Sequence, residues 1–240
     1  MEILFRLTQA MSVFVVIAYL YSKSPLFKSL TADSIRTRDR IYLYLVFSSL
    51  SILGTFLGVP VQDAIANTRA IGPVLAGIIG GPLLGTAVGF TGGLHRYSLG
   101  GFTAFSCGLA TMLAGTLGGI VHLSLYGKNR SEQSFDPKVA FLTALFAEIV
   151  EMGIILLVSR PYTNAVALVQ VIALPMILSN AVGAALFMSI IRDQKNTVDR
   201  IAAVSSAKAF KIAERTLSIL ARGINGEAAV ALAKIIHKET

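Results

Sequence analysis

Six apolar stretches, most of them long enough to cross a lipid bilayer, constrain the fold of this chain more than any other feature. They run roughly over 3–22, 43–60, 70–93, 102–124, 139–158 and 164–191. A helix needs about 20 apolar residues to cross about 30 Å of hydrocarbon, and within hydrocarbon only helices and closed barrels satisfy their backbone polar groups. We therefore predict an all-α fold, a polytopic membrane helix bundle.

The distribution of charge supports a membrane setting. Only 14% of the residues are charged, against about a quarter in soluble domains. The net charge of +8 gathers at the edges of the apolar stretches, which suits anionic headgroups and not nucleic acid. The N-terminus lacks the pattern of a cleaved signal peptide, so we expect a retained membrane helix. A single cysteine, Cys107, excludes an intramolecular disulfide.

Charge parity indicates that one stretch does not cross simply. Three basic segments, around 23–40, 124–139 and after 191, should all be cytoplasmic by the positive-inside rule. Five simple crossings lie between the first basic segment and the last. Because five is odd, these two segments would then lie on opposite sides of the membrane. The stretch 70–93 has Gly80-Gly81-Pro82 at its middle, a strong turn signal. We predict that it forms a re-entrant hairpin of two short helices, which gives seven membrane segments and a cytoplasmic C-terminus.

The hairpin would place two arginines on one external side. Arg69 and Arg96 flank it, and Arg160 is the only other arginine expected outside. A lone arginine near a membrane is usually an interfacial anchor, but two at the open ends of one hairpin indicate an anion site. A guanidinium binds a carboxylate through two parallel hydrogen bonds, and a charge in a low-dielectric site must be paired.

Three polar residues adjoin these arginines. His95 is either an interfacial side chain or a hydrogen-bond donor that makes binding pH-dependent. Asn67 in IANTR is expected to cap the first hairpin helix, and Asp63 is a partner for Arg69 in an empty site.

The segment GGFTAFSCGLATM adds three residues. Thr103, Ser106 and Cys107 share a helix face that would line the site below Arg96. A lone membrane cysteine is usually a small apolar residue, and no histidine or acid has the spacing that would activate it as a nucleophile.

Two acids lie inside the fifth apolar stretch. Glu148 and Glu151 are three residues apart on one helix face, and intramembrane acids are functional by default. Two interpretations compete: helix-to-helix hydrogen bonding with Asn180 or Gln170, and ion coupling.

The C-terminal part differs in character. Residues 1–191 are predicted to form the membrane domain, and 192–222 a cytoplasmic helix. It is a surface helix or a dimer-forming signalling helix, with an apolar stripe of Ala203, Ser206, Phe210, Ala213, Leu217 and Leu220. Gly223 would end it, Asn225 would cap a helix over 226–238, and 223–240 reads as the start of another domain.

Catalytic motifs are missing from the sequence. It contains no Gly-x-x-x-x-Gly-Lys phosphate loop, no Cys/His metal spacing and no Ser/His/Asp set. We therefore expect no catalysis, metal or cofactor within these 240 residues.

The run IANTRAIGPVLAGIIGGPLLGTAVGFTGGLHRYSLGGFTAFSC, residues 65–107, resembles the membrane sensor domain of LytS-type histidine kinases. SKSPLF, 22–27, and NAVGAALFM, 180–188, extend the likeness to essentially the whole chain, which looks most similar to the BtsS-type (YehU) branch of pyruvate sensors. The membrane part also resembles, more weakly, the substrate-binding components of energy-coupling-factor vitamin transporters.

The resemblance implies an inner-membrane homodimer with a cytoplasmic GAF domain, a kinase module and a LytTR-type response regulator as partner. In the BtsS-like branch the ligand is external pyruvate, and the binding residues map onto Arg69, Arg96 and Cys107. A serine of that branch's site is Ala110 here, for which Ser106 or Thr111 is the substitute.

Two functions follow as hypotheses. The first is the input domain of a sensor kinase, in which ligand binding shifts the hairpin against the last apolar stretch, with Pro175 as a hinge. The second is a transporter or transport subunit for a small organic anion. The helix at 192–222 favours the sensor, and the two buried acids favour the transporter. A structural scaffold would leave the paired arginines unexplained.

Overall fold

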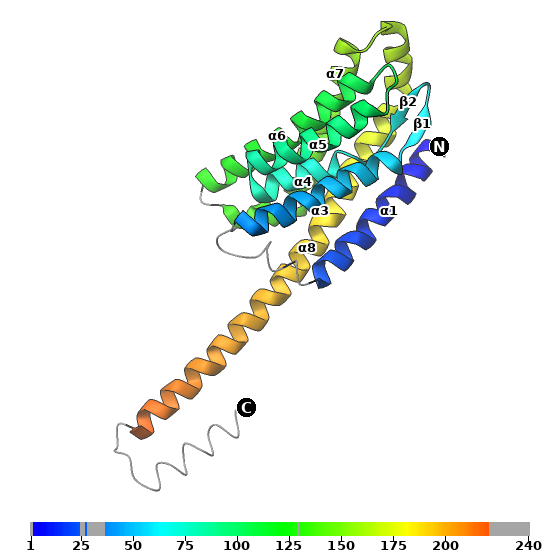
Figure 1. The fold of residues 1–240 in the computed structure, drawn as a ribbon. Coiled ribbons are helices and arrows are strands. Elements are labelled where there is room, and N and C mark those ends of the chain that lie inside the picture. Colours follow the sequence, from blue (N-terminus) through cyan, green and yellow to red (C-terminus); the bar gives the residue numbers. More distant parts are fainter. Residues whose placement is uncertain (1, 25–26, 28–36, 129, 221–240) are drawn as a thin grey trace. The chain divides into compact units, whose positions relative to one another are not determined.

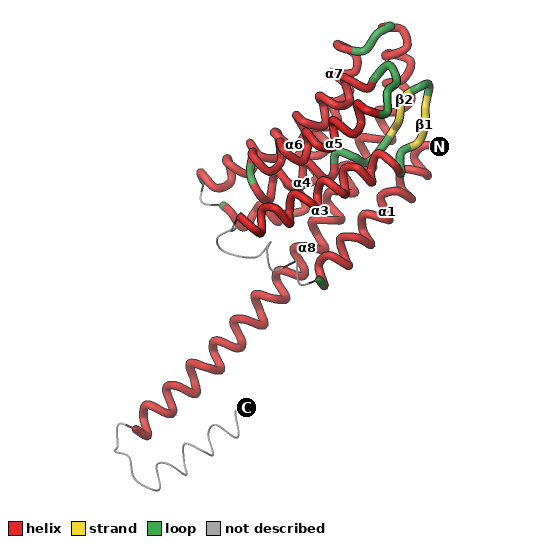
Figure 2. Tube along the Cα trace, viewed as in Figure 1, coloured by secondary structure: helices red, strands yellow, loops and turns green. Residues whose placement is uncertain are grey.

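The described part of the protein is helical nearly throughout (Figures 1 and 2). The computed structural model describes residues 2–24, 27, 37–128 and 130–220. The chain divides into two compact units, residues 1–192 and 193–240, which are treated separately below.

Seven α-helices make up most of the described chain. They are α1 (Glu2–Lys23), α3 (Thr37–Phe56), α4 (Ile71–Gly80), α5 (Pro82–Ser98), α6 (Ala104–Gly127), α7 (Pro137–Val158) and α8 (Tyr162–Leu220). A short 3-10 helix, η2 (Ser131–Phe135), precedes α7. Within the described residues, four helices are long and apolar enough to cross a membrane: α1, α6, α7 and the Tyr162–Lys211 part of α8. The predicted all-α membrane bundle is confirmed.

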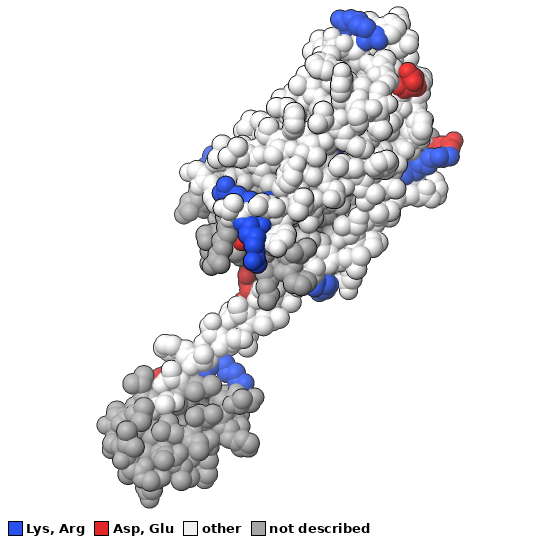
Figure 3. Space-filling view, in the orientation of Figure 1, with Lys and Arg blue, Asp and Glu red and all other residues white. Residues whose placement is uncertain are grey.

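The surface of the first unit is that of a protein solvated by lipid. Large apolar side chains are widely exposed, among them Leu83 at 81% and Leu157 at 76%. The face seen in Figure 3 is uncharged over its middle, and the charged side chains lie towards its ends. In water such a surface would be a large uncovered apolar patch, so we place it in contact with hydrocarbon.

The stretch 70–93 is broken at its middle, as predicted. Helix α4 ends at Gly80, and α5 begins at Pro82. Gly81 between them has φ 86°, a conformation that L side chains rarely adopt, and its N–H donates to the Gly77 carbonyl at 2.9 Å. Proline at the first position of α5 lacks the N–H that would be unsatisfied there. Residues 71–79 are all buried, so the short α4 is enclosed by protein.

Helices α5 and α6 approach each other at backbone distance. A Cβ atom on Gly115 would lie 2.0 Å from the Gly85 carbonyl oxygen, and one on Gly93 would lie 2.4 Å from the Gly108 carbonyl oxygen. Small residues permit this approach in membrane helix pairs. The α5–α6 contact fixes α6, and the polar residues on it, against the hairpin.

We expect Gly115→Ala to lower the free energy of unfolding by about 1–3 kcal/mol, because the added methyl group overlaps backbone that cannot rotate away. Gly153→Ala is the matched control, since nothing lies within 4 Å of a Cβ there. It should be neutral or stabilising by about 0.5–1 kcal/mol. Thermal unfolding in detergent measures both, and equal midpoints would contradict the close approach.

The apolar pattern of 43–60 suggested one continuous helix, but the structure shows that the helix ends before the stretch does. Helix α3 ends at Phe56, and β1 (Val59–Val61) pairs antiparallel with β2 (Ala64–Ala66). Gln62 and Asp63 form the turn, with φ values of 47° and 60°, as in the two-residue loops that match strand twist. Proline at 60 cannot donate in a continuing helix. The hairpin leads directly into the segment that carries Arg69.

The described part of the second unit is the helical segment 193–220. Its side chains are mostly exposed, including Ala203, Ser206, Phe210 and Ala213 of the predicted apolar stripe. Lys195 and Asp199 pair at 2.6 Å along its surface. The described chain contains a helix through residue 220, whereas Gly223, Asn225 and 226–238 lie outside the described residues. Dimer formation stays a prediction, as do the domain boundaries.

Candidate functional site

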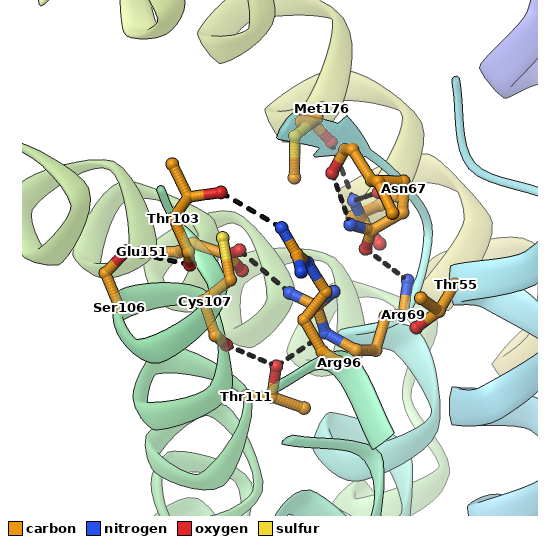
Figure 4. A network of polar contacts seen from close by, with 12 residues as sticks. Thr55, Asn67, Arg69, Arg96, Thr103, Ser106, Cys107, Thr111, Glu151 and Met176 are labelled. Atoms are coloured by element: carbon orange, nitrogen blue, oxygen red, sulfur yellow. Dashed lines mark hydrogen bonds and ion pairs between the residues drawn. The ribbon is translucent and has the colours of Figure 1, made fainter. Parts of the chain in front are cut away.

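Two arginines, both with 0% exposure, form the centre of the site. Arg69 lies in the short segment between β2 and α4, and Arg96 lies in the last turn of α5. The break at Gly81 folds the two helices back on each other, so their outer ends meet. Arg96 is within electrostatic range of Arg69, Cys107 and Glu151, and Figure 4 shows these residues together.

Arg69 is held by three different elements. Its Nε donates to the Thr111 hydroxyl on α6, and its Nη2 forms an ion pair of 3.0 Å with Glu151 on α7. Its backbone N–H donates to the Asn67 side chain at 3.1 Å. Nη1 is buried with no hydrogen-bond partner among the described residues. The guanidinium is therefore fixed in direction, and one nitrogen is left to bind something else.

Arg96 is held only by neutral groups. Its Nη1 donates to the Gly100 carbonyl at 2.7 Å and its Nη2 to the Thr103 hydroxyl at 3.0 Å. Nε is buried without a partner, and none of the ion pairs in the described chain involves Arg96. A buried cation without a paired anion is costly, so this side chain is the clearest indication of an anionic ligand.

One face of α6 lines the site. Thr103, Cys107 and Thr111 follow at four-residue steps and lie on the same side of the helix (Figure 4). Cys107 is a buried free thiol. Ser106, also predicted to line the site, forms its hydrogen bonds elsewhere: its hydroxyl bonds the Ser159 hydroxyl at 2.7 Å and donates to the Thr103 carbonyl at 3.0 Å. Thr111 is the hydroxyl that reaches Arg69. The sequence signal for Thr111 as a site residue was its position four residues after Cys107, on the same helix face.

Three residues predicted near the arginines have other contacts. Ala70, and not Asn67, is the N-cap of α4, so the expected cap was wrong. Asn67 instead accepts from the backbone of Arg69 two residues on, as an Asx turn, because the segment before α4 turns there. The His95 ring packs on Phe56 with centroids 5.0 Å apart, and its buried Nδ1 has no hydrogen-bond partner in the part of the chain that the structure describes. Asp63 does not pair with Arg69, although it is within electrostatic range of Arg96.

Both intramembrane acids are buried, Glu148 at 0% and Glu151 at 2%. One of the two interpretations, helix-to-helix hydrogen bonding with Asn180 or Gln170, is not found for either acid among the described residues, and ion coupling stays a prediction. Glu151 faces Arg69, and the Asn180 amide instead donates to the carbonyls of Asn67 at 3.0 Å and Met176 at 3.1 Å. The partner of Glu151 depends on how α7 is rotated about its own axis, and the sequence does not reveal this rotation. Asn180 thus joins α8 to the segment that carries Arg69.

We expect Thr111→Val to destabilise the protein by about 1.5–3 kcal/mol, the range for hydrogen bonds to charged groups, because it leaves the buried Arg69 Nε without an acceptor. Thr143→Val is the control. The Thr143 hydroxyl is also buried and donates to a carbonyl four residues back, that of Val139, as Thr111 does to Cys107. The unfolding midpoint in detergent should fall only for Thr111→Val. Equal shifts would contradict the assigned role.

This chemistry suits a small carboxylate with a second polar oxygen. Two guanidinium groups provide charge and direction, and the Cys107 thiol and two threonine hydroxyls lie next to them. Among the residues that the structure describes, no group of three His, Cys, Asp or Glu is placed to hold a metal ion. The site can bind and orient an anion.

Comparison with known proteins shows which family this chain is similar to. The family model 5TM-5TMR_LYT, described as "5TMR of 5TMR-LYT", matches residues 24–194. The chain is 46% identical over 233 residues to the sensor histidine kinase BtsS of Escherichia coli K12, covering 97% of this chain and 42% of that protein. It is 30% identical over 255 residues to the sensor protein LytS of Bacillus subtilis, covering 100% of this chain and 42% of that protein. The chain thus spans about two fifths of the length of these relatives. No solved structure matches it.

Proposed function

Because this chain belongs to the 5TM-5TMR_LYT family, we propose that it is the ligand-binding membrane domain of a sensor histidine kinase and that its ligand is a small external carboxylate, pyruvate above all. The resemblance to LytS-type sensors is confirmed, and the protein is a multi-pass protein of the bacterial inner membrane. Phosphorylation of a response regulator, by a module outside these residues, belongs to the proposal.

The buried Arg96 without an acid partner is the observation that carries this proposal. The ligand carboxylate would accept from Arg96 and from the partnerless Nη1 of Arg69. The keto oxygen would accept from the Cys107 thiol or from a hydroxyl on the same α6 face. Thr111 then takes the place that a serine at position 110 holds in the BtsS-like branch, since here that residue is Ala110.

The route to the kinase would begin at the segment 67–70. Asn180 of α8 donates to the Asn67 carbonyl, two residues from Arg69. A ligand that pulls on Arg69 therefore displaces a direct neighbour of α8, the helix that continues beyond the membrane domain. Pro175, five residues before Asn180, lacks the N–H for a backbone hydrogen bond within α8 and provides the hinge. The ligand shifts this equilibrium only by binding one arrangement better.

Calorimetric titration of the purified protein with pyruvate, lactate and acetate tests the proposal. We expect saturable binding of pyruvate, weaker binding of lactate and weaker still of acetate, because acetate lacks the second oxygen. A folded protein that binds none of the three would overturn the pyruvate assignment.

A transport subunit for a small organic anion is the second candidate, favoured by the buried Glu148 and Glu151. Uptake of labelled pyruvate into proteoliposomes separates the two. The sensor proposal expects no uptake above that of empty liposomes, and saturable uptake would favour transport.

A further inference from the structure

We propose that Glu151 is a built-in competitor of the ligand: its carboxylate holds Arg69 in the empty site and must give way when a ligand carboxylate binds. This inference rests on the proposed function and concerns the same site. It makes Glu151 a residue that sets ligand affinity.

The contact between Glu151 and Arg69 is a single hydrogen-bonded ion pair. Only Oε1 of Glu151 contacts the guanidinium, at 3.0 Å from Nη2. The Thr111 hydroxyl accepts from Nε, and Nη1 has no hydrogen-bond partner among the residues that the structure describes. A carboxylate that grips a guanidinium fully uses two parallel hydrogen bonds. Because Thr111 occupies Nε, a ligand carboxylate can form two parallel hydrogen bonds with Arg69 only at Nη1 and Nη2, and it then displaces Glu151 from Nη2.

Charge gives the reason for competition. Arg69 lies near two buried acids: Glu151 pairs with it, and Glu148 is within electrostatic range of both Glu151 and Arg69. A ligand carboxylate adds a further negative charge to this enclosed group. Like charges repel strongly where water is excluded, so the ligand and Glu151 cannot both bind Arg69 as tightly as either does alone.

The pairing also explains how the empty site persists. Without Glu151, Arg69 would be a second buried arginine with no acid partner, which is costly, and Glu151 supplies the anion for it from α7. Since the ligand must replace Glu151, part of its binding free energy is used to break the existing pair. The domain then responds only to ligand concentrations high enough to displace its own carboxylate.

The test is calorimetric titration with pyruvate of the wild type, Glu151→Gln and Glu148→Gln. Glutamine keeps the shape of the side chain and removes its charge. We expect Glu151→Gln to bind pyruvate at least about tenfold more tightly, in line with close charge pairs. Glu148→Gln is the matched control, because this acid lies three residues away, is equally buried and has no hydrogen bond to Arg69 among the described residues. We expect it to change affinity less than about threefold.

The contrary outcomes are distinct. Unchanged or weaker pyruvate binding by Glu151→Gln would overturn the competition and leave the proposed function standing. An equal gain in Glu148→Gln would overturn it too, since the effect would then be one of total charge. Absence of binding in the wild type and all variants would overturn the proposed function itself.

A second variant guards against misfolding. Glu151→Asp keeps the charge but shortens the side chain, so its carboxylate no longer reaches Arg69 from the same backbone position. We expect it to fold and to bind pyruvate more tightly than the wild type, by less than Glu151→Gln. If Glu151→Gln does not fold, this variant decides: affinity equal to or below that of the wild type would overturn the inference.

Discussion

Arg69→Met is expected to abolish pyruvate binding, with an affinity loss of at least about a hundredfold, and to destabilise the protein by about 3–5 kcal/mol. Both effects have one cause. The substitution removes a guanidinium that would bind the ligand, and it leaves the Glu151 carboxylate, 2% exposed, without its ion-pair partner. Calorimetric titration measures the first effect and thermal unfolding in detergent the second.

The double variant Arg69→Met/Glu151→Gln separates the two effects. With both charges gone, the stability should return to within about 1–2 kcal/mol of the wild type, because apolar or neutral replacement of a buried ion pair is often nearly neutral. Pyruvate binding should stay absent. Restored binding in the double variant would show that Arg69 serves only to pair Glu151, and the site would then be assigned wrongly.

Arg96→Gln is expected to weaken pyruvate binding by at least about a hundredfold while lowering stability by less than about 2 kcal/mol. The reason for this contrast is the nature of the partners. Arg96 donates to the Gly100 carbonyl and the Thr103 hydroxyl, which are neutral groups, so its removal leaves no buried charge behind. Glutamine can still donate to one of them.

Arg160→Gln provides the control for Arg96→Gln. Arg160 is exposed and donates to the adjacent Ser159 carbonyl, so its loss should leave both stability and pyruvate affinity unchanged. The same titration and unfolding measurements apply. A large loss of stability in Arg96→Gln, with affinity unchanged, would make Arg96 a structural residue and remove the main support for the proposed ligand.

The local chemistry of the sequence determined the membrane bundle, the broken stretch 70–93 and the two arginines at its ends. Apolar length reports a membrane helix directly, and Gly81-Pro82 stops a helix whatever surrounds it. Charge parity required the hairpin because a bilayer has only two sides. The α3 boundary was missed, since apolar length alone does not distinguish a helix from the strand Val59–Val61, although Pro60 is a signal against a continuing helix.

Tertiary structure alone decided which groups meet the arginines. Glu151 is 82 residues from Arg69 in the chain, and its pairing depends on how α7 is rotated about its own axis. Thr111, and not Ser106, reaches Arg69 because glycines at 85, 93, 108 and 115 let α5 and α6 approach to backbone contact and so fix the face that α6 presents. Helix periodicity states which residues share a face, and only packing between helices states what that face touches.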